Sequence, residues 1–291
     1  MEKTGYRLKK LLLVLCVLAN VLIWYAVFYF DGHQNLLIHF FDVGQGDSIL
    51  IESQNGNQIL IDGGPGNAVV SKLDESLPFW DRSLDLLILT HAHADHVDGL
   101  VEVLKRYRIG MILESGEAYS TPEYYEWHNI IKEKNIPVVI ARRGQIVHVS
   151  KDIRLNVLSP FGNYNGVSVK NPHDANVSTK LVYAATSALL MGDAEKPIEY
   201  RLLFENREML KSDILKVGHH GSRTSTTEDF LKEVSPKFAI ISVGRKNRYG
   251  HPHQEVIDRL TSFGTHIFRT DEDRDVTFVS DGRRFEKMGG K

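Results

Sequence analysis

The segment "LILTHAHADHVDGL", residues 87–100, constrains the fold most strongly, because an apolar run is followed there at once by five potential metal ligands. These side chains fall within eight consecutive positions and are His91, His93, Asp95, His96 and Asp98. Their spacing does not align them on one helix face, but a turn at a strand end can bring them together. Imidazole and carboxylate groups suit zinc, manganese or iron. Because burying so many titratable groups without a metal is costly, the segment predicts a metal site at a strand end, with a solvated polar loop as the alternative.

The sequence from about residue 36 onward predicts a layered α/β domain. Short runs rich in β-branched and aromatic residues, such as "NLLIHFFDV", "DSILIES" and "QILIDGG", predict strands separated by turns. The nearly continuous apolar run "DLLILT" is typical of a strand buried on both faces. Strand-like and helix-like segments then alternate twice. This order favours helices packed outside two central sheets, with functional groups in the loops at the strand ends.

The apolar run "LLLVLCVLANVLIWYAVFYF", residues 11–30, has no charged side chain and is long enough for a helix to cross a bilayer. A cleaved signal peptide is the alternative, but this run is longer than a typical signal core and ends in bulky residues. The basic residues Lys3, Arg7, Lys9 and Lys10 precede the run, and Asp31 and His33 follow it closely. By the positive-inside rule, the N-terminus is expected in the cytoplasm. We therefore predict a single-pass membrane protein, with a cytoplasmic tip and transmembrane signal anchor over residues 1–35 and an extracytoplasmic domain over residues 36–291.

Net charge and cysteine content narrow the classes of protein and of metal site that the chain can form. The formal net charge of −2 does not indicate a protein coated in basic charge for nucleic acid, although a local basic patch remains open. The single cysteine, Cys16, lies in the apolar N-terminal run. Disulfides within the chain and cysteine-based metal sites are therefore excluded.

Two later junctions repeat the pattern of an apolar strand followed by polar side chains. "SALLMGDAE" places Asp193 directly after a strand, and "ILKVGHHGS" ends another strand with His219 and His220. Alone, an aspartate after a glycine indicates a turn or a cap, and paired loop histidines are more often exposed than ligated. Together with the first cluster, they favour one composite metal site.

These motifs carry a resemblance to a known family. "HAHADH" matches the H-x-H-x-D-H signature of metallo-β-lactamase fold hydrolases, and "GDAE" and "KVGHHGS" match the later ligand motifs of that fold. More narrowly, "HFFDVGQGDSILI", "LIDGG", "LKVGHHGS" and "NRYGHPH" resemble the soluble hydrolase domain of ComEC-type competence (DNA-uptake) proteins. Phosphorylcholine esterases of the same fold share several of these strings. The resemblance covers residue 36 to the end and implies an α/β, four-layer αββα fold, here preceded by one N-terminal transmembrane helix.

The resemblance also implies the roles of individual residues around two divalent metal ions, Zn²⁺ or Mn²⁺. His91 and His93 would hold the first ion, Asp95 and His96 the second, and Asp193 would bridge both. His219 is expected to complete the second site, which leaves His220 facing the substrate. Asp47 and Asp62 match positions at the edge of the site, where a carboxylate can orient ligating histidines, or they are simply turn aspartates.

One departure from the family pattern concerns the first site. Classical β-lactamases and glyoxalases supply a third histidine in a "GHTPG"-like string, which this sequence lacks. The matching region, "NPHDANVSTKLVY", has Asn176 and Ser178 as in ComEC-like domains, with His173 as a nearby alternative ligand. We expect Asn176, Ser178 and His251 to bind substrate. The departure leaves occupancy of the first site open and argues against β-lactam hydrolysis.

Two adjacent metals can lower the pKa of a shared water and stabilise displacement at phosphorus, so a phosphodiester is the expected substrate class. Asp95 would orient the attacking group, and His220 or a histidine of "GHPH" would donate a proton to the leaving oxygen. The family suggests DNA, and the basic, aromatic loop "GRKNRYGHPH" could contact a single strand or be merely solvated.

The expected function is therefore a membrane-anchored, metal-dependent phosphodiesterase or nuclease that acts on DNA outside the cytoplasm. The alternatives are a small-molecule phosphodiesterase of the phosphorylcholine-esterase type and a non-catalytic binding module that retains the fold. ComEC proteins also carry a multi-helix channel domain, whereas this chain has one candidate span. A separate DNA-channel protein is thus an expected partner.

Overall fold

The computed structural model describes residues 2–31 and 35–289, in two compact units that comprise residues 1–35 and 36–291. The first unit contains one helix, α1 (Glu2–Asp31). Its segment Gly5–Ala26 has a mean hydropathy of 1.9 and is long and apolar enough to cross a membrane, a test that a signal sequence also passes. His33, which the topology prediction used, lies outside the described residues.

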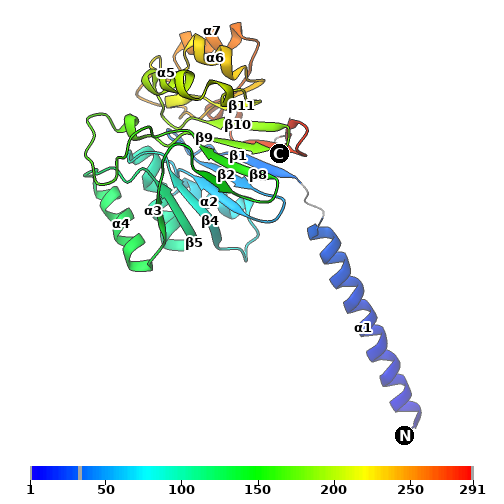
Figure 1. Cartoon of the computed structure of the whole chain (residues 1–291). Coiled ribbons are helices and arrows are strands. Elements are labelled where there is room, and N and C mark those ends of the chain that lie inside the picture. The colour runs from blue at the N-terminus through cyan, green and yellow to red at the C-terminus, as the bar shows by residue number, and fades with distance from the viewer. Residues whose placement is uncertain (1, 32–34, 290–291) are drawn as a thin grey trace. The chain divides into compact units, whose positions relative to one another are not determined.

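The second unit contains two β-sheets (Figure 1). The first sheet has the strand order β15-β14-β1-β2-β3-β4-β5-β6. Its strands are β1 (Leu36–Phe40), β2 (Ile49–Glu52), β3 (Gln58–Ile61), β4 (Ser83–Leu89), β5 (Arg108–Glu114), β6 (Val138–Ile140), β14 (Val276–Ser280) and β15 (Phe285–Lys287). Strands β3 to β6 run parallel to one another, so the loops after them lie at one edge of the sheet.

The second sheet has the strand order β13-β12-β11-β10-β9-β8-β7. Its strands are β7 (Ile146–His148), β8 (Ile153–Val157), β9 (Thr179–Tyr183), β10 (Thr186–Leu190), β11 (Ile214–Lys216), β12 (Phe238–Ile241) and β13 (His266–Arg269). Strands β10 to β13 are parallel, and their carboxyl ends also gather at one edge.

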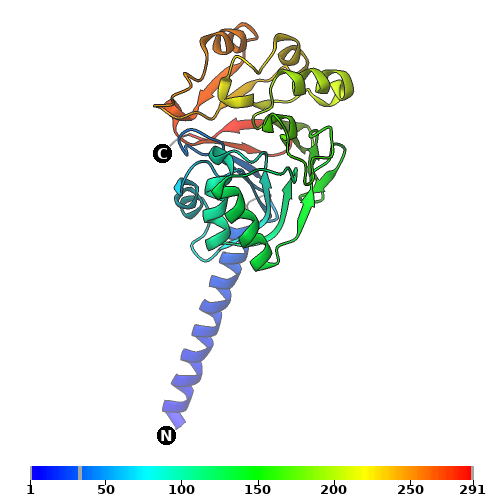
Figure 2. The same cartoon turned by 90° about the vertical axis from the view of Figure 1, so that its left-hand side faces the viewer.

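Helices cover the outer face of each sheet (Figures 1 and 2). The first sheet is covered by α2 (Ala68–Ser76), α3 (Ala94–Arg106) and α4 (Pro122–Lys134), and the second by α5 (Lys196–Glu205), α6 (Glu228–Val234) and α7 (Gln254–Ser262). The connecting segments contain the one-turn helix α8 (Thr270–Asp273) and the 3₁₀ turns η1 (Pro172–Ala175), η2 (Arg207–Met209) and η3 (Gly218–Gly221). Strand β2 shows how the layers form: Ile49 and Ile51 enter the core between the sheets, whereas Leu50 packs in the core that the first sheet shares with α2, α3 and α4. A third core joins the second sheet to α5, α6 and α7. The predicted four-layer αββα arrangement is confirmed.

Local sequence signals explain the boundaries of α4. The hydroxyl of Thr121 accepts a hydrogen bond from the backbone of Tyr124, and Pro122 follows it at the first helical position of α4. Asn135 ends the same helix with a left-handed φ of 52°. A cap, a proline at the start and an asparagine at the end are typical helix limits.

Candidate metal centre

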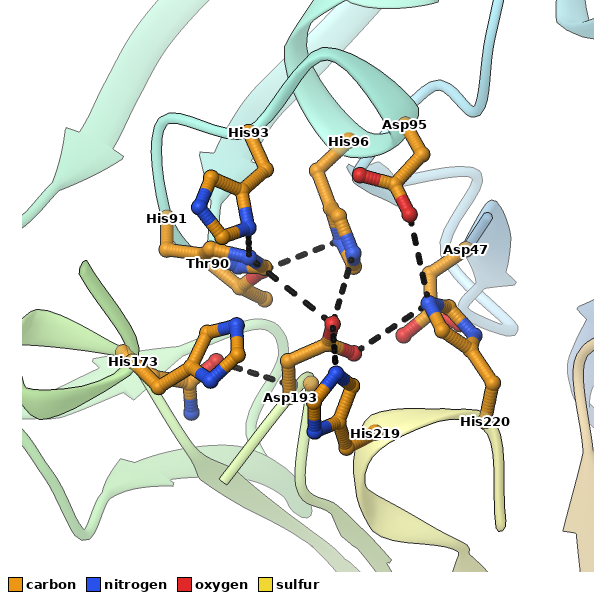
Figure 3. Close-up of polar contacts among 12 residues, drawn as sticks. Asp47, Thr90, His91, His93, Asp95, His96, His173, Asp193, His219 and His220 are labelled. Atoms are coloured by element: carbon orange, nitrogen blue, oxygen red, sulfur yellow. Dashed lines mark hydrogen bonds and ion pairs between the residues drawn. The ribbon is translucent and has the colours of Figure 1, made fainter. Parts of the chain in front are cut away.

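The candidate metal centre forms where the parallel strands of both sheets end. The chain leaves β4 at Leu89 and enters α3 at Ala94, with His93 at the N-cap. His91 and His93 therefore lie in a tight loop, and Asp95 and His96 lie in the first helical turn. Asp193 follows β10, and the histidine pair follows β11. Figure 3 shows the histidine side chains of both sheets converging on Asp193.

One group of donor atoms comprises Asp95, His96, Asp193 and His220, all within 4.8 Å of one another. Nε2 of His96 lies 3.4 Å from Oδ2 of Asp193, and Nε2 of His220 lies 3.4 Å from Oδ1 of Asp193. A tetrahedral ion bound at about 2.0–2.1 Å separates its ligands by roughly 3.3 Å, which is close to these distances. Three of the buried atoms, Nε2 of both histidines and Oδ1 of Asp193, make no hydrogen bond within the described chain. This group therefore fits a divalent metal ion.

A second group comprises His91, His93 and His173, again within 4.8 Å of one another. Nε2 of His91 lies 3.0 Å from Nδ1 of His93 and 3.8 Å from Oδ2 of Asp193. Neither ring nitrogen of the buried His173 makes a hydrogen bond within the described residues. A third imidazole is thus available near His91 and His93, from the segment where the expected family histidine is missing. Asp98, the fifth residue of the first cluster, belongs to neither group and accepts a hydrogen bond from the backbone of Gly66 at 2.7 Å.

The adjacent residues His219 and His220 enter different groups. His220 joins Asp95, whose Oδ2 lies 3.5 Å from its Nε2. His219 instead groups with His173 and Asp193, and its Nε2 lies 3.9 Å from Oδ2 of Asp193. Both residues have left-handed φ values, 47° and 54°. Two consecutive non-glycine residues in this region are strained, which is typical of functional turns. The geometry therefore places His220, rather than the expected His219, beside Asp95 and His96.

Buried polar partners hold the ligand side chains in place. Asp62 accepts hydrogen bonds at 2.7 Å from both Nδ1 of His96 and Oγ1 of Thr90. Nδ1 of His220 donates to the carbonyl oxygen of Ser242 at 2.8 Å and lies 3.4 Å from Asp47. Such partners fix the tautomer and the orientation of a ligating imidazole. In both rings, Nε2 is left to face Asp193.

Asn176 and Ser178 lie beneath the centre, and the expectation that they bind substrate is corrected. Both side chains are fully buried. The Asn176 amide accepts a hydrogen bond from the backbone of Asp193 at 2.9 Å and donates to the carbonyl of Met191 at 2.8 Å. The Ser178 hydroxyl donates to that same carbonyl at 3.1 Å. They therefore fix the turn that presents Asp193, because no polar atom of theirs reaches the surface.

Three supporting residues were not predicted from the sequence. Lys216 is fully buried, forms an ion pair with Asp47, and donates to the carbonyl of Gly192 at 3.2 Å. A lysine inside the apolar run "ILKVG" was the available signal. Glu195, at the end of "GDAE", lies 3.5 Å from Nδ1 of His173 and 3.2 Å from Nδ1 of His219. Glu117 accepts a hydrogen bond at 2.9 Å from the backbone between His91 and His93, and no local motif marks it.

The pKa shifts of the imidazoles differ between the two donor groups. Burial holds the pKa of His91 well below its usual range and lowers the pKa of His93 to about 4. Burial alone would raise the pKa of Asp95, but His96 and His220 lower it to about 2. The same two histidines outweigh burial at Asp193 and hold its pKa well below the usual range. Neighbouring carboxylates, Asp193 foremost, outweigh burial and hold the pKa of His96 and of His220 well above the usual range. Because neutral imidazoles and ionised carboxylates are the forms that bind metals, a metal ion at this group must displace the protons of these two rings.

A pocket of about 300 Å³ opens above the donor atoms. It is lined by Gln45, His93, Ala94, Asp95, His173, Asp193, His219, His220, Tyr249 and His251. Burial, with help from His219 and His220, lowers the pKa of His251 to about 4, so this ring is neutral at pH 7. Tyr249 is 50% exposed at the rim, stacks on His251 and accepts a hydrogen bond from Arg248 at 2.9 Å.

The fold and the two donor groups define a metallo-hydrolase, and the comparison with known families agrees. The sequence profile of the metallo-beta-lactamase superfamily matches residues 41–245, so the chain belongs to this superfamily of metal-dependent hydrolases. Igni18, a metallo hydrolase from the archaeon Ignicoccus hospitalis, shares the fold with a TM-score of 0.52 and 14% identity, over 84% of this chain and 98% of that one.

Among curated proteins, the chain is homologous to competence proteins. It is 31% identical over 288 residues to ComE operon protein 3 of Bacillus subtilis, and 34% identical over 233 residues to competence protein ComA of Neisseria gonorrhoeae. These alignments cover 91% and 79% of this chain but 35% and 30% of the relatives. The chain thus spans about a third of the length of these curated relatives.

Proposed function

We propose that this protein is a membrane-anchored phosphodiesterase that uses two divalent metal ions, Zn²⁺ or Mn²⁺, to cleave DNA outside the cytoplasm. The observation that carries the proposal is the pair of donor groups at the base of an open pocket, of which one contains Asp193 and the other brings His91 to 3.8 Å from its Oδ2. Two ions held in this way would polarise a phosphodiester and lower the pKa of a shared water.

In this proposal, His91, His93 and His173 hold the first ion, while Asp95, His96 and His220 hold the second. Asp193 belongs to the group of the second ion, and its Oδ2 also lies 3.8 Å from Nε2 of His91, so its carboxylate would be within reach of both ions. His173 supplies the third imidazole of the first site, so the absence of the family histidine does not leave that site incomplete. This assignment gives His220 the ligand role first expected for His219. The ring of His219 instead contacts Glu195 and lines the pocket.

The remaining pocket residues contact the substrate. The ionised carboxylate of Asp95 accepts a hydrogen bond from the attacking water and orients it, in addition to its ligand role. His219 and His251 line the pocket, and a neutral His251 can donate an N–H hydrogen bond to the leaving oxygen. At the rim, Tyr249 offers an aromatic face to a base and Arg248 a cation to a phosphate, a combination used by single-strand binders.

The competence relatives favour DNA over a small phosphodiester, and α1 is the proposed anchor. With the basic residues of the N-terminus on the cytoplasmic side, the domain over residues 36–291 lies outside. A separate DNA-channel protein is the proposed partner, because the relatives are competence proteins.

The test uses the full chain in detergent, depleted of metal with a chelator and reloaded with Mn²⁺ or Zn²⁺. Cleavage of end-labelled single-stranded DNA is expected, together with slower hydrolysis of bis-p-nitrophenyl phosphate. Hydrolysis of the small ester with DNA left intact would instead support a phosphodiesterase for small molecules. Retention of less than about one equivalent of metal would overturn the enzyme proposal and favour a binding module.

A matched pair of aspartate variants locates the chemistry. Asp95→Ala removes a carboxylate from the pocket and should abolish turnover while the protein stays folded. Asp98→Asn lies in the same cluster, outside both donor groups, and should retain turnover. Unchanged activity in Asp95→Ala would contradict the assigned role.

A further inference from the structure

Two large aromatic side chains are exposed side by side in the turn between α2 and β4. Phe79 is 80% exposed and Trp80 is 63% exposed, and their rings pack edge to face with centroids 4.8 Å apart. Within residues 35–289, no other two neighbours in sequence both expose large apolar side chains. Single exposed apolar residues are common, whereas contiguous ones mark interaction surfaces.

Hydrogen bonds of Asp81 fix the turn that carries this aromatic pair. The backbone N–H of Asp81 donates to the carbonyl of Pro78 at 2.8 Å. The Asp81 carboxylate accepts hydrogen bonds from the backbone of Ser83 at 3.1 Å and from the amide of Gln58 at 3.0 Å. The pair is therefore presented in a fixed position, which limits the entropy lost when a partner covers it.

The aromatic pair lies at the edge of the first sheet where the chain enters the domain, which we call the entry edge. Strand β1 is antiparallel to β2, β2 is antiparallel to β3, and β3 is parallel to β4. The strands β1 and β4 therefore start at the same edge, at Leu36 and Ser83, about 14 Å apart across three strand spacings. Five residue steps separate Asp31, the last residue of α1, from Leu36, so they lie within about 18 Å.

From this placement we propose that Phe79 and Trp80 insert into the headgroup region of the bilayer that α1 crosses; the inference rests on the proposed anchoring. Tryptophan suits this region because its ring is apolar and its N–H is polar. The turn after β14, whose Ser280 pairs with Leu36, adds the exposed Arg283 and Arg284 to the entry edge. Guanidinium groups there can meet lipid phosphates.

This contact with the bilayer has a consequence for the substrate. The metal centre lies at the opposite ends of the strands, and the seven residues of β4 alone separate the two edges by roughly 23 Å. The pocket is then held away from the headgroups of the anchoring bilayer. A soluble strand of DNA reaches such a pocket more readily than a lipid of the same membrane.

The test is fluorescence quenching in phosphatidylcholine–phosphatidylglycerol vesicles whose acyl chains are brominated near the headgroups. The full chain has three tryptophans, Trp24 in α1, Trp80 in the turn and the fully buried Trp127. In the Trp24→Phe variant, the brominated lipid is expected to quench the emission of Trp80. Adding Trp80→Phe should leave only Trp127, whose emission should be the same in brominated and plain vesicles.

Two further variants separate the possible failures. Trp80→Phe alone reports on Trp24, so quenching there establishes the anchor independently. Tyr249→Trp, added to the variant without Trp24 and Trp80, places an exposed indole at the pocket rim and should remain unquenched. If Trp24 is quenched and Trp80 is not, the proposed insertion is overturned, while α1 is still established as the anchor. This result is expected if a protein, rather than lipid, covers Phe79 and Trp80. If neither Trp24 nor Trp80 is quenched, both the anchoring and the insertion are overturned. Quenching in the Tyr249→Trp variant overturns the proposal that the pocket lies away from the bilayer.

Discussion

Replacing Asp62 with asparagine tests whether the carboxylate behind His96 prepares that ring for a metal. Both residues are fully buried, and Nδ1 of His96 donates to Asp62 at 2.7 Å. The contact keeps the proton on Nδ1 and leaves the lone pair of Nε2 facing Asp193. In Asp62→Asn, the amide oxygen can still accept the N–H of Thr90, but the NH₂ group then faces Nδ1. A neutral His96 would have to carry its proton on Nε2, where the metal binds.

Loss of such a partner typically lowers metal affinity by about 10–100-fold, which corresponds to about 1.4–2.7 kcal/mol of binding free energy. The assay titrates metal-free protein with Zn²⁺ in competition with a fluorescent chelator. Thr90→Val is the control, because it removes the hydroxyl contacts to Asp62, His91 and His96 but keeps the shorter bond between Asp62 and His96. We expect a smaller loss for it. A folded Asp62→Asn variant with wild-type affinity would refute the role of the carboxylate.

Three further predictions concern the same region. His220→Ala should weaken metal binding more than His219→Ala in the same competition assay, because only His220 belongs to the donor group of Asp95. Equal losses of metal affinity in the two variants would contradict the assignment of His220 as a ligand. Lys216→Met leaves the buried carboxylate of Asp47 without its ion-pair partner. Urea unfolding of the metal-free variant should show a free energy of unfolding lower by about 3–5 kcal/mol, and adding Asp47→Asn should restore part of it. Wild-type stability of Lys216→Met would argue against a stabilising role of the ion pair. Burial raises the pKa of Glu117 from 4.5 to about 7, so the folded state holds more protons than the unfolded state between these values, and stability falls as the pH rises through them. Glu117→Gln should therefore stabilise the metal-free protein by up to about 3 kcal/mol at pH 8 and not at pH 4, and a gain independent of pH would exclude this cause.

The sequence by itself determined the layered fold and the strand ends at which the candidate metal centre lies. Strand periodicity and the alternation of strands with helices are local properties, and they predicted two sheets covered by helices. The compact spacing of the first histidine cluster allowed few structures other than a loop at a strand end. Asp193 and the histidine pair were found in the same way, because each directly follows an apolar strand.

The tertiary structure alone decided how these side chains divide between the two donor groups. His219 and His220 are identical in type and adjacent, so only the left-handed turn that carries them separates their directions. His173 and Asn176 were both candidates for the missing histidine position, and the burial of Asn176 under Asp193 leaves His173 facing His91. Lys216 and Asp47 are 169 residues apart and pair only across the folded sheets. Local sequence can mark a side chain as a ligand, but the direction of that side chain depends on backbone geometry and on contacts between distant segments.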